Sequence, residues 1–236
     1  MFELIVAKWQ GLPLFSSFLV GFAVQLLIYL AVVTGSYVLF GGLRRVLSIG
    51  ALFDSRPFKA GQFQHELSYS LSTCGVLGIY TVLSLKYLGA AWPTSWFVAV
   101  IQAVVFYLLY DLYFYWWHRL LHTRFLSPIH GKHHRSVRVT PWAVHSLHPL
   151  EAAGSYLPVV LFAVACQPGF GLVLLVQFIL VFQSVGGHSN YNPLRPPLLV
   201  HLFRFHQLHH EFGRSNFGFI GTHWDALFGT HEKAHP

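Results

Sequence analysis

The chain has 236 residues, of which 54% are hydrophobic, 17% aromatic and only 10% charged. This composition is too apolar for a soluble domain of this length and favours a membrane protein. The formal net charge of +7 would suit a nucleic-acid ligand. However, the basic residues are spread over segments that flank apolar runs, no nucleic-acid motif accompanies them, and anionic lipid headgroups explain them better.

Three apolar stretches in the first half of the chain predict single membrane spans. The first, Leu12 to Phe40, is uncharged and longer than the roughly 20 residues that a helix needs to cross the bilayer core. Its length also argues against a cleaved signal peptide. A second span is expected from about Ser68 to Leu88 and a third from about Trp96 to Trp117.

A fourth apolar stretch, Glu151 to Gly187, is interrupted at Gln167-Pro168-Gly169. Proline and glycine break helices and favour tight turns, so this stretch predicts a transmembrane helical hairpin. We find no sequence repeat or linker and expect residues 1–236 to form one domain.

The distribution of Lys and Arg predicts the orientation in the membrane. With the N-terminus outside, the segments 41–66, 119–150 and 188–236 are cytoplasmic and hold 13 of the 15 basic residues. The same assignment places all 16 histidines on the cytoplasmic side, although histidine was not used to make it.

Three histidine boxes place their imidazoles three or four residues apart, a spacing that puts side chains on one face of a helix. The boxes are formed by His118 and His122, by His130, His133 and His134, and by His206, His209 and His210. Neutral imidazole binds zinc, copper, iron and nickel, and seven or more imidazoles exceed the need of one tetrahedral site. The boxes therefore predict a site for two metal ions.

The third span carries a stripe formed by Asp111, Tyr115, His118 and His122. Asp111 lies inside the apolar span, where an unpaired carboxylate is costly. It could pair with Arg or Lys from a neighbouring helix, or it could accept a hydrogen bond from the second ring nitrogen of His118 and orient that ligand. We favour the second interpretation and treat Asp111 and Tyr115 as catalytic candidates.

The second box is expected on a helix that begins at Pro128, since proline is tolerated in a first turn. His145 and His148, three residues apart, and His188, where the hairpin returns to the cytoplasm, are further candidate ligands. The remaining histidines lack box spacing and are not expected to bind metal; they are His65, His201, His223, His231 and His235.

From Asp111 to Thr230 the chain resembles the fatty acid hydroxylase and sterol desaturase superfamily of membrane-bound non-haem di-iron enzymes. The resemblance rests on the boxes, on His148-Pro149-Leu150-Glu151, on Ser215-Asn216-Phe217-Gly218 and on the stretch from Trp224 to Thr230. It implies an all-α integral membrane protein with about four transmembrane helices, including a helical hairpin, under a cytoplasmic helical cap that holds a histidine-rich dimetal site.

The resemblance also implies the chemistry. Two iron ions, which zinc could replace in crystals, would use O2 to hydroxylate or desaturate an unactivated C–H bond of a sterol or fatty-acyl lipid taken from the bilayer. Electrons would come from a separate donor such as cytochrome b5 or ferredoxin with an NAD(P)H reductase. The substrate, the carbon attacked and the oligomeric state stay open.

The alternative functions are a histidine-rich metal transporter and a haem electron-transfer protein. A transporter should place its ligands near the middle of the bilayer. A haem between two helices needs one axial imidazole from each rather than adjacent pairs such as His133 and His134. Because the expected ligands gather at one membrane surface, we favour the oxidoreductase.

Overall fold

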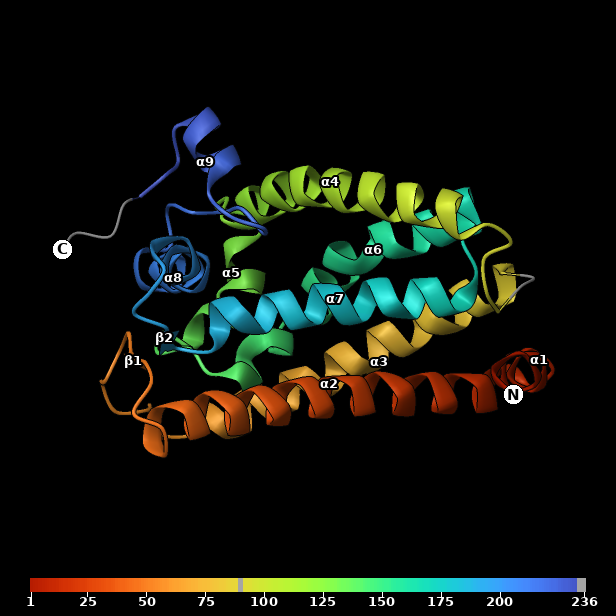
Figure 1. The fold of residues 1–236 in the computed structure, drawn as a ribbon, viewed down its shortest axis with the longest axis horizontal. Coiled ribbons are helices and arrows are strands. Elements are labelled where there is room, and N and C mark those ends of the chain that lie inside the picture. Colours follow the sequence, from red (N-terminus) through yellow and green to blue (C-terminus); the bar gives the residue numbers. More distant parts are fainter. Residues whose placement is uncertain (89–90, 233–236) are drawn as a thin grey trace.

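The computed structural model describes residues 1–88 and 91–232, and its ribbon is almost entirely helical (Figure 1). The α-helices are α1 (Phe2–Gln10), α2 (Leu14–Arg45), α3 (Gln62–Tyr87), α4 (Trp96–Leu121), α5 (Ser127–His130), α6 (Pro149–Cys166), α7 (Phe170–His188), α8 (Pro197–Phe212) and α9 (His223–Phe228). Two 3-10 turns cover His133–Arg135 and Pro141–His145, and the strands β1 (Ala51–Leu52) and β2 (Tyr191–Asn192) pair antiparallel. The predicted all-α class is confirmed.

Five helices of the described part of the chain, α2, α3, α4, α6 and α7, are long and apolar enough to cross a membrane. The apolar stretches predicted three single spans and a two-helix hairpin, whereas the family resemblance implied about four helices in all. The structure agrees with the apolar stretches, and the hairpin arms have 18 residues in α6 and 19 in α7. The hairpin turn lies where it was expected. Gly169 has a φ of +89°, and a Cβ there would lie 2.7 Å from the backbone of Trp92, so the turn requires glycine.

The long helices pack through small residues and buried polar groups. A Cβ on Gly21 of α2 would lie 2.8 Å from the carbonyl oxygen of Gly78 in α3, so the absence of side chains lets these two backbones approach closely. Nearby, the Gln25 amide donates to Thr81 Oγ1 at 2.7 Å and to Gln177 Oε1 at 2.9 Å. These bonds join α2, α3 and α7 and satisfy polar groups that would otherwise be costly in an apolar interior.

The short elements gather at one end of the bundle. Figure 1 shows α5, α8, α9 and the two strands at the end opposite α1, with α8 seen along its axis. The C-terminal end of α4 and the C-terminal end of α7 reach the same end. All three histidine boxes and His188 therefore lie on one side of the apolar bundle, as a site at a membrane surface requires.

Candidate metal centre

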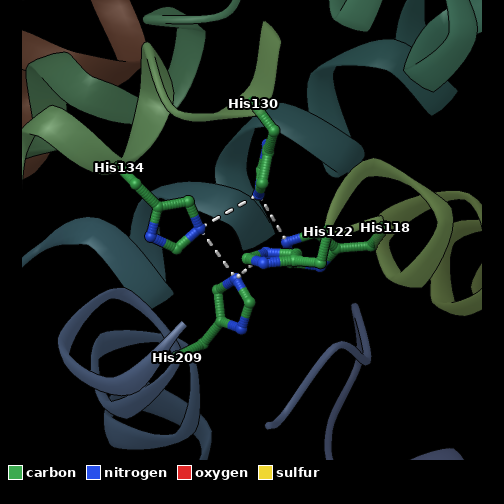
Figure 2. A group of neighbouring side chains, drawn as sticks. All are labelled: His118, His122, His130, His134 and His209. Atoms are coloured by element: carbon green, nitrogen blue, oxygen red, sulfur yellow. Dashed lines mark hydrogen bonds between the residues drawn. The ribbon is translucent and has the colours of Figure 1, made fainter. Parts of the chain in front are cut away.

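Five imidazoles converge in a first group, group one, formed by His118, His122, His130, His134 and His209 (Figure 2). They come from the end of α4, from α5, from the following 3-10 turn and from α8. The ligand nitrogens all lie within 4.8 Å of one another. His134 Nε2 lies 3.0 Å from both His130 Nε2 and His209 Nε2, and His118 Nε2 lies 3.1 Å from His130 Nε2.

In two of these rings, the hydrogen-bond partner of Nδ1 determines which nitrogen carries the proton. His118 Nδ1 lies 3.0 Å from the carbonyl oxygen of Phe217, and His209 Nδ1 lies 2.6 Å from that of Ser215. A carbonyl oxygen only accepts, so Nδ1 carries the proton and Nε2 of the neutral ring presents a lone pair. Facing lone pairs cannot bond to each other. The inward-facing Nε2 atoms of group one are therefore suited to bind a cation. The Nδ1 atoms of His118 and His209 are held by hydrogen bonds, as is usual for histidines that bind metal.

Four further imidazoles form group two, which consists of His133, His188, His206 and His210. His188 is the last residue of α7, and its Nε2 lies 3.2 Å from His133 Nε2, 3.1 Å from His206 Nε2 and 3.3 Å from His210 Nε2. Its Nδ1 donates to the carbonyl oxygen of Ser184 at 2.8 Å. A Cβ on Gly187 would lie 2.9 Å from His206 Cβ, so glycine before His188 lets α8 approach α7 at this point.

Adjacent residues of the chain serve different groups. His133 belongs to group two and His134 to group one, and His210 and His209 are divided in the same way. The expected single helix over the second box is wrong, because α5 ends at His130 and a 3-10 turn carries His133 and His134. The break follows from Gly131, which is a poor helix former.

The chain after this break is held by a buried carboxylate. Glu66 of α3 accepts from Ser136 Oγ at 2.7 Å and from Thr140 Oγ1 at 2.6 Å. These bonds draw the segment toward α3 and away from the axis of α5. Two adjacent imidazoles can therefore point into two neighbouring groups.

Burial keeps these histidines neutral. Desolvation, the largest cause, lowers the pKa of His134 to about 3 and that of His122 to about 4. The same cause, reinforced by neighbouring imidazoles, holds the pKa of His206, His209 and His210 well below its usual range. Neutral imidazole is the form that binds metal, so the two groups present ligands at neutral pH without prior loss of protons.

The donor set fits two transition-metal ions. Neighbouring ligands at about 90° around an ion about 2.1 Å away would lie about 3.0 Å apart, close to the nitrogen spacing in both groups. The two groups, as found among residues 1–88 and 91–232, contain only histidine. Nitrogen ligands accept iron, zinc, copper or nickel, so the site by itself does not select the metal.

The structure brings nine of the eleven candidate ligands into the two groups and leaves His145 and His148 outside them. His145 is buried, stacks on Tyr29 with ring centroids 5.0 Å apart, and lies 3.1 Å from Tyr156 Oη through Nε2. His148 Nδ1 accepts from the backbone N–H of Leu150 at 3.2 Å and so caps α6.

The expected hydrogen bond from His118 to Asp111 is wrong, since His118 Nδ1 is bonded to Phe217. Asp111 instead accepts from the backbone N–H of Ile220 at 2.8 Å and from Trp224 Nε1 at 2.6 Å, and it pairs with His223 Nε2 at 2.7 Å. The other interpretation, a pair with Arg or Lys, is wrong as well, because the side-chain partners of Asp111 are Trp224 and His223. Asp111 thus holds the segment that contains Phe217 and orients His118 only indirectly.

The other catalytic candidate, Tyr115, is also placed against the C-terminal segment. Its Oη lies 3.0 Å from Thr230 Oγ1 and accepts from Arg119 at 3.3 Å. The sequence analysis assigned no role to Asp225, although this residue lies in the stretch from Trp224 to Thr230 that contributes to the family resemblance. Asp225 accepts from the backbone N–H groups of Phe217 and Gly218 at 2.8 and 2.9 Å. Two carboxylates therefore fix the loop that orients His118.

Replacing Asp111 with alanine is expected to lower the free energy of unfolding by about 1–3 kcal/mol, because it leaves the partly buried donors of Ile220 and Trp224 without an acceptor. Chemical denaturation in detergent measures the loss, and limited proteolysis should detect new cleavage between residues 213 and 230. The matched control Glu3→Ala, at an exposed acid in α1, should change stability by less than about 0.5 kcal/mol. Equal stability of D111A and the wild type would contradict this role.

An apolar cavity of about 470 Å³ adjoins both histidine groups. Its lining includes His118 and His130 of group one, and His133, His188 and His206 of group two. Phe114, Leu147, Leu180 and Phe219 contribute apolar wall. An apolar molecule in this cavity would lie directly against the metal-binding nitrogens.

The model of the fatty acid hydroxylase family matches residues 103–230, more than half of the chain. Methylsterol monooxygenase 1 of Gallus gallus is 30% identical over 184 residues, which cover 73% of this chain and 60% of that protein. Delta(7)-sterol 5(6)-desaturase of Leptosphaeria maculans is 26% identical over 213 residues, covering 84% of this chain and 58% of that protein.

A third relative, very-long-chain aldehyde decarbonylase GL1-8 of Oryza sativa subsp. indica, is 32% identical over 145 residues, which cover 57% of this chain and 53% of that protein. The chain thus spans about 60% or less of the length of these three relatives. No solved structure matches the chain.

Proposed function

Because the chain belongs to the fatty acid hydroxylase family, we propose that it is a membrane-bound oxidoreductase that uses O2 to hydroxylate or desaturate a sterol or fatty-acyl lipid. We further propose that groups one and two each hold one iron ion. The observation that carries the proposal is the convergence of nine imidazoles into two groups at the wall of an apolar cavity. The relatives named as sterol monooxygenase and sterol desaturase support the same class of reaction.

When bound, the two iron ions would supply the activation of O2 and the attack on an unactivated C–H bond. The residues of the chain hold these ions and shape their surroundings. Phe217, Ser215 and Glu151 accept from Nδ1 of His118, His209 and His130, respectively, and keep each Nε2 directed inward. The apolar wall excludes water and holds the lipid against the histidines.

The proposed orientation places the metal end of the bundle in the cytoplasm. Arg44 and Arg45 lie in the last turn of α2 at that end, while Lys8 lies on α1 at the opposite end. This distribution is the one that the positive-inside rule favours. A cytoplasmic metal centre would receive electrons from a separate carrier such as cytochrome b5 or ferredoxin with an NAD(P)H reductase.

The test combines metal analysis with lipid analysis. Purified protein reconstituted with iron is expected to hold about two ions per chain, and less than one would contradict the proposal. Lipid extracts of cells with the gene should contain a species shifted by about +16 Da for hydroxylation or about −2 Da for desaturation relative to cells without it. A Soret band in the optical spectrum would instead indicate haem.

A further inference from the structure

Glu151, in the first turn of α6, has a buried carboxylate. Only one of its two oxygens has a role in the proposed function, as the acceptor for His130. Its side chain is 3% exposed, and Oε1 lies 2.6 Å from His130 Nδ1. Oε2 is buried and has no hydrogen-bond partner among the described residues. A buried oxygen of this kind is costly unless a further group bonds to it.

The residue lies in the wall of the apolar cavity, and it is the only Asp, Glu, Lys or Arg among the described residues that line it. Two other polar residues of the lining have partners within the protein. Gln183, which also lines the cavity, donates to the carbonyl oxygen of Phe219 at 3.2 Å. Tyr156 Oη lies 3.1 Å from His145 Nε2. A molecule that fills the cavity is therefore the natural source of a partner for Glu151.

Ser155 lines the same cavity one turn further along α6. Residues four apart share a helix face, so Ser155 and Glu151 are neighbours on α6. Ser155 Oγ accepts from Trp117 Nε1 at 3.1 Å, which leaves the hydroxyl proton able to donate. The indole is close to this turn, because a Cβ on Gly154 would lie 2.1 Å from the Trp117 ring.

We propose that Glu151 and Ser155 form a polar subsite that binds the hydroxyl group of a neutral lipid substrate. The proposal rests on the proposed function and specifies its substrate class. A hydroxyl can donate to the carboxylate of Glu151 and accept from Ser155 at the same time. Glu151 is hydrogen-bonded to His130 of group one, so a substrate hydroxyl held by Glu151 lies close to the metal centre. The substrate carbon that is oxidised is therefore expected within a few covalent bonds of that hydroxyl.

The same subsite disfavours a free fatty acid. A substrate carboxylate would enter an apolar cavity whose described lining contains no Lys or Arg to pair with it, so its buried charge would be costly. A phosphate headgroup meets the same obstacle. The substrate class is therefore a sterol or a long-chain alcohol, and the hydroxyl is the feature that the two have in common.

Binding to the metal-free protein in detergent micelles tests the subsite without turnover. Cholesterol is compared with cholest-5-ene and hexadecan-1-ol with hexadecane, so that each pair differs only by the hydroxyl. Hexadecanoate, at a pH where it is ionised, tests the acidic headgroup. We expect the wild type to bind the hydroxylated member of at least one pair about tenfold or more tightly, consistent with one or two buried hydrogen bonds, and to bind hexadecanoate more weakly than hexadecan-1-ol.

Three variants separate the subsite from a merely structural role. Glu151→Gln retains an oxygen that can accept from His130 but removes the second carboxylate oxygen; it should reduce the hydroxyl preference to within about twofold. Ser155→Ala should reduce the hydroxyl preference several-fold. Gln183→Leu, at a polar residue of the same cavity that already has a partner, should leave the preference unchanged.

The outcomes are distinct from those of the metal and lipid analyses. A preference in the sterol pair alone assigns a sterol, one in the alcohol pair alone assigns a long-chain alcohol, and one in both supports the shared chemistry. Equal binding within both pairs, hexadecanoate binding as tightly as hexadecan-1-ol, or an unchanged preference in E151Q would overturn the subsite and leave the proposed function standing. If E151Q does not fold, an unchanged preference in S155A overturns it.

Discussion

Replacing His188 with alanine is expected to lower the metal content of the purified protein from about two ions per chain to about one. The Nε2 atom of His188 lies 3.1 to 3.3 Å from those of the other three members of group two, so its loss opens that group while group one stays complete. Groups that only orient a ligand cost about 10–100-fold in metal affinity or activity when removed, so loss of the ligand itself should lower turnover by more than about 100-fold. Metal analysis and lipid analysis measure the two effects.

The control for this variant is His148→Asn. His148 lies outside both groups and caps α6, and asparagine is a good N-cap residue, so two ions per chain and unchanged helix content are expected. Two ions per chain in H188A would show that group two is not a metal site. One ion per chain in H148N would show that the ligand set extends beyond the nine imidazoles.

Removal of the metals with a chelator is expected to lower the melting temperature by about 10 °C or more. A ligand that binds only the folded state contributes about 4 kcal/mol when its concentration is 1,000 times its dissociation constant, and 1 kcal/mol corresponds to about 2–4 °C in a chain of this size. Thermal denaturation before and after chelation measures the shift, and added iron should reverse it. An unchanged melting temperature would contradict the proposed occupancy of the two groups.

The metal-free protein should also lose stability as the pH is lowered from about 7 to 5. The pKa of His134 is about 3 in the folded chain, below the ordinary value of 6.5, so below pH 6.5 the unfolded chain takes up a proton that the folded chain does not. The free energy of unfolding therefore falls with decreasing pH until the folded-state pKa is reached. His134→Asn removes one such group and should give a shallower dependence, whereas a flat profile in the wild type would contradict the burial of these rings.

The features predicted from sequence are those that depend on local patterns. Membrane spans follow from runs of apolar residues, and the hairpin turn at Gln167-Pro168-Gly169 follows from the backbone preferences of proline and glycine. The boxes could be identified for the same reason, since a spacing of three or four residues is visible in the chain itself. His188 could be predicted as a ligand although it lies far from the boxes in sequence. The predicted hairpin returns the chain to the same side of the membrane at this residue.

The features that were missed depend on contacts between distant residues. Spacing alone did not separate His145 and His148, which lie outside the groups, from the ligating candidates. Asp111 lies about two turns before His118 on the same face of α4, yet its partners Ile220 and Trp224 lie more than 100 residues further along the chain. The division of His133 and His134 between two groups depends on a helix break and on Glu66, 70 residues away from Ser136.

The hairpin α6–α7 begins and ends beside the histidine groups, with Glu151 on His130 at its start and His188 in group two at its end. The start of the hairpin therefore completes the surroundings of group one, and its end completes group two. It follows that both groups can bind metal with their full set of ligands only after these last two candidate spans have entered the bilayer. A chain with a misinserted hairpin would lack His188 in group two and the contact between Glu151 and His130.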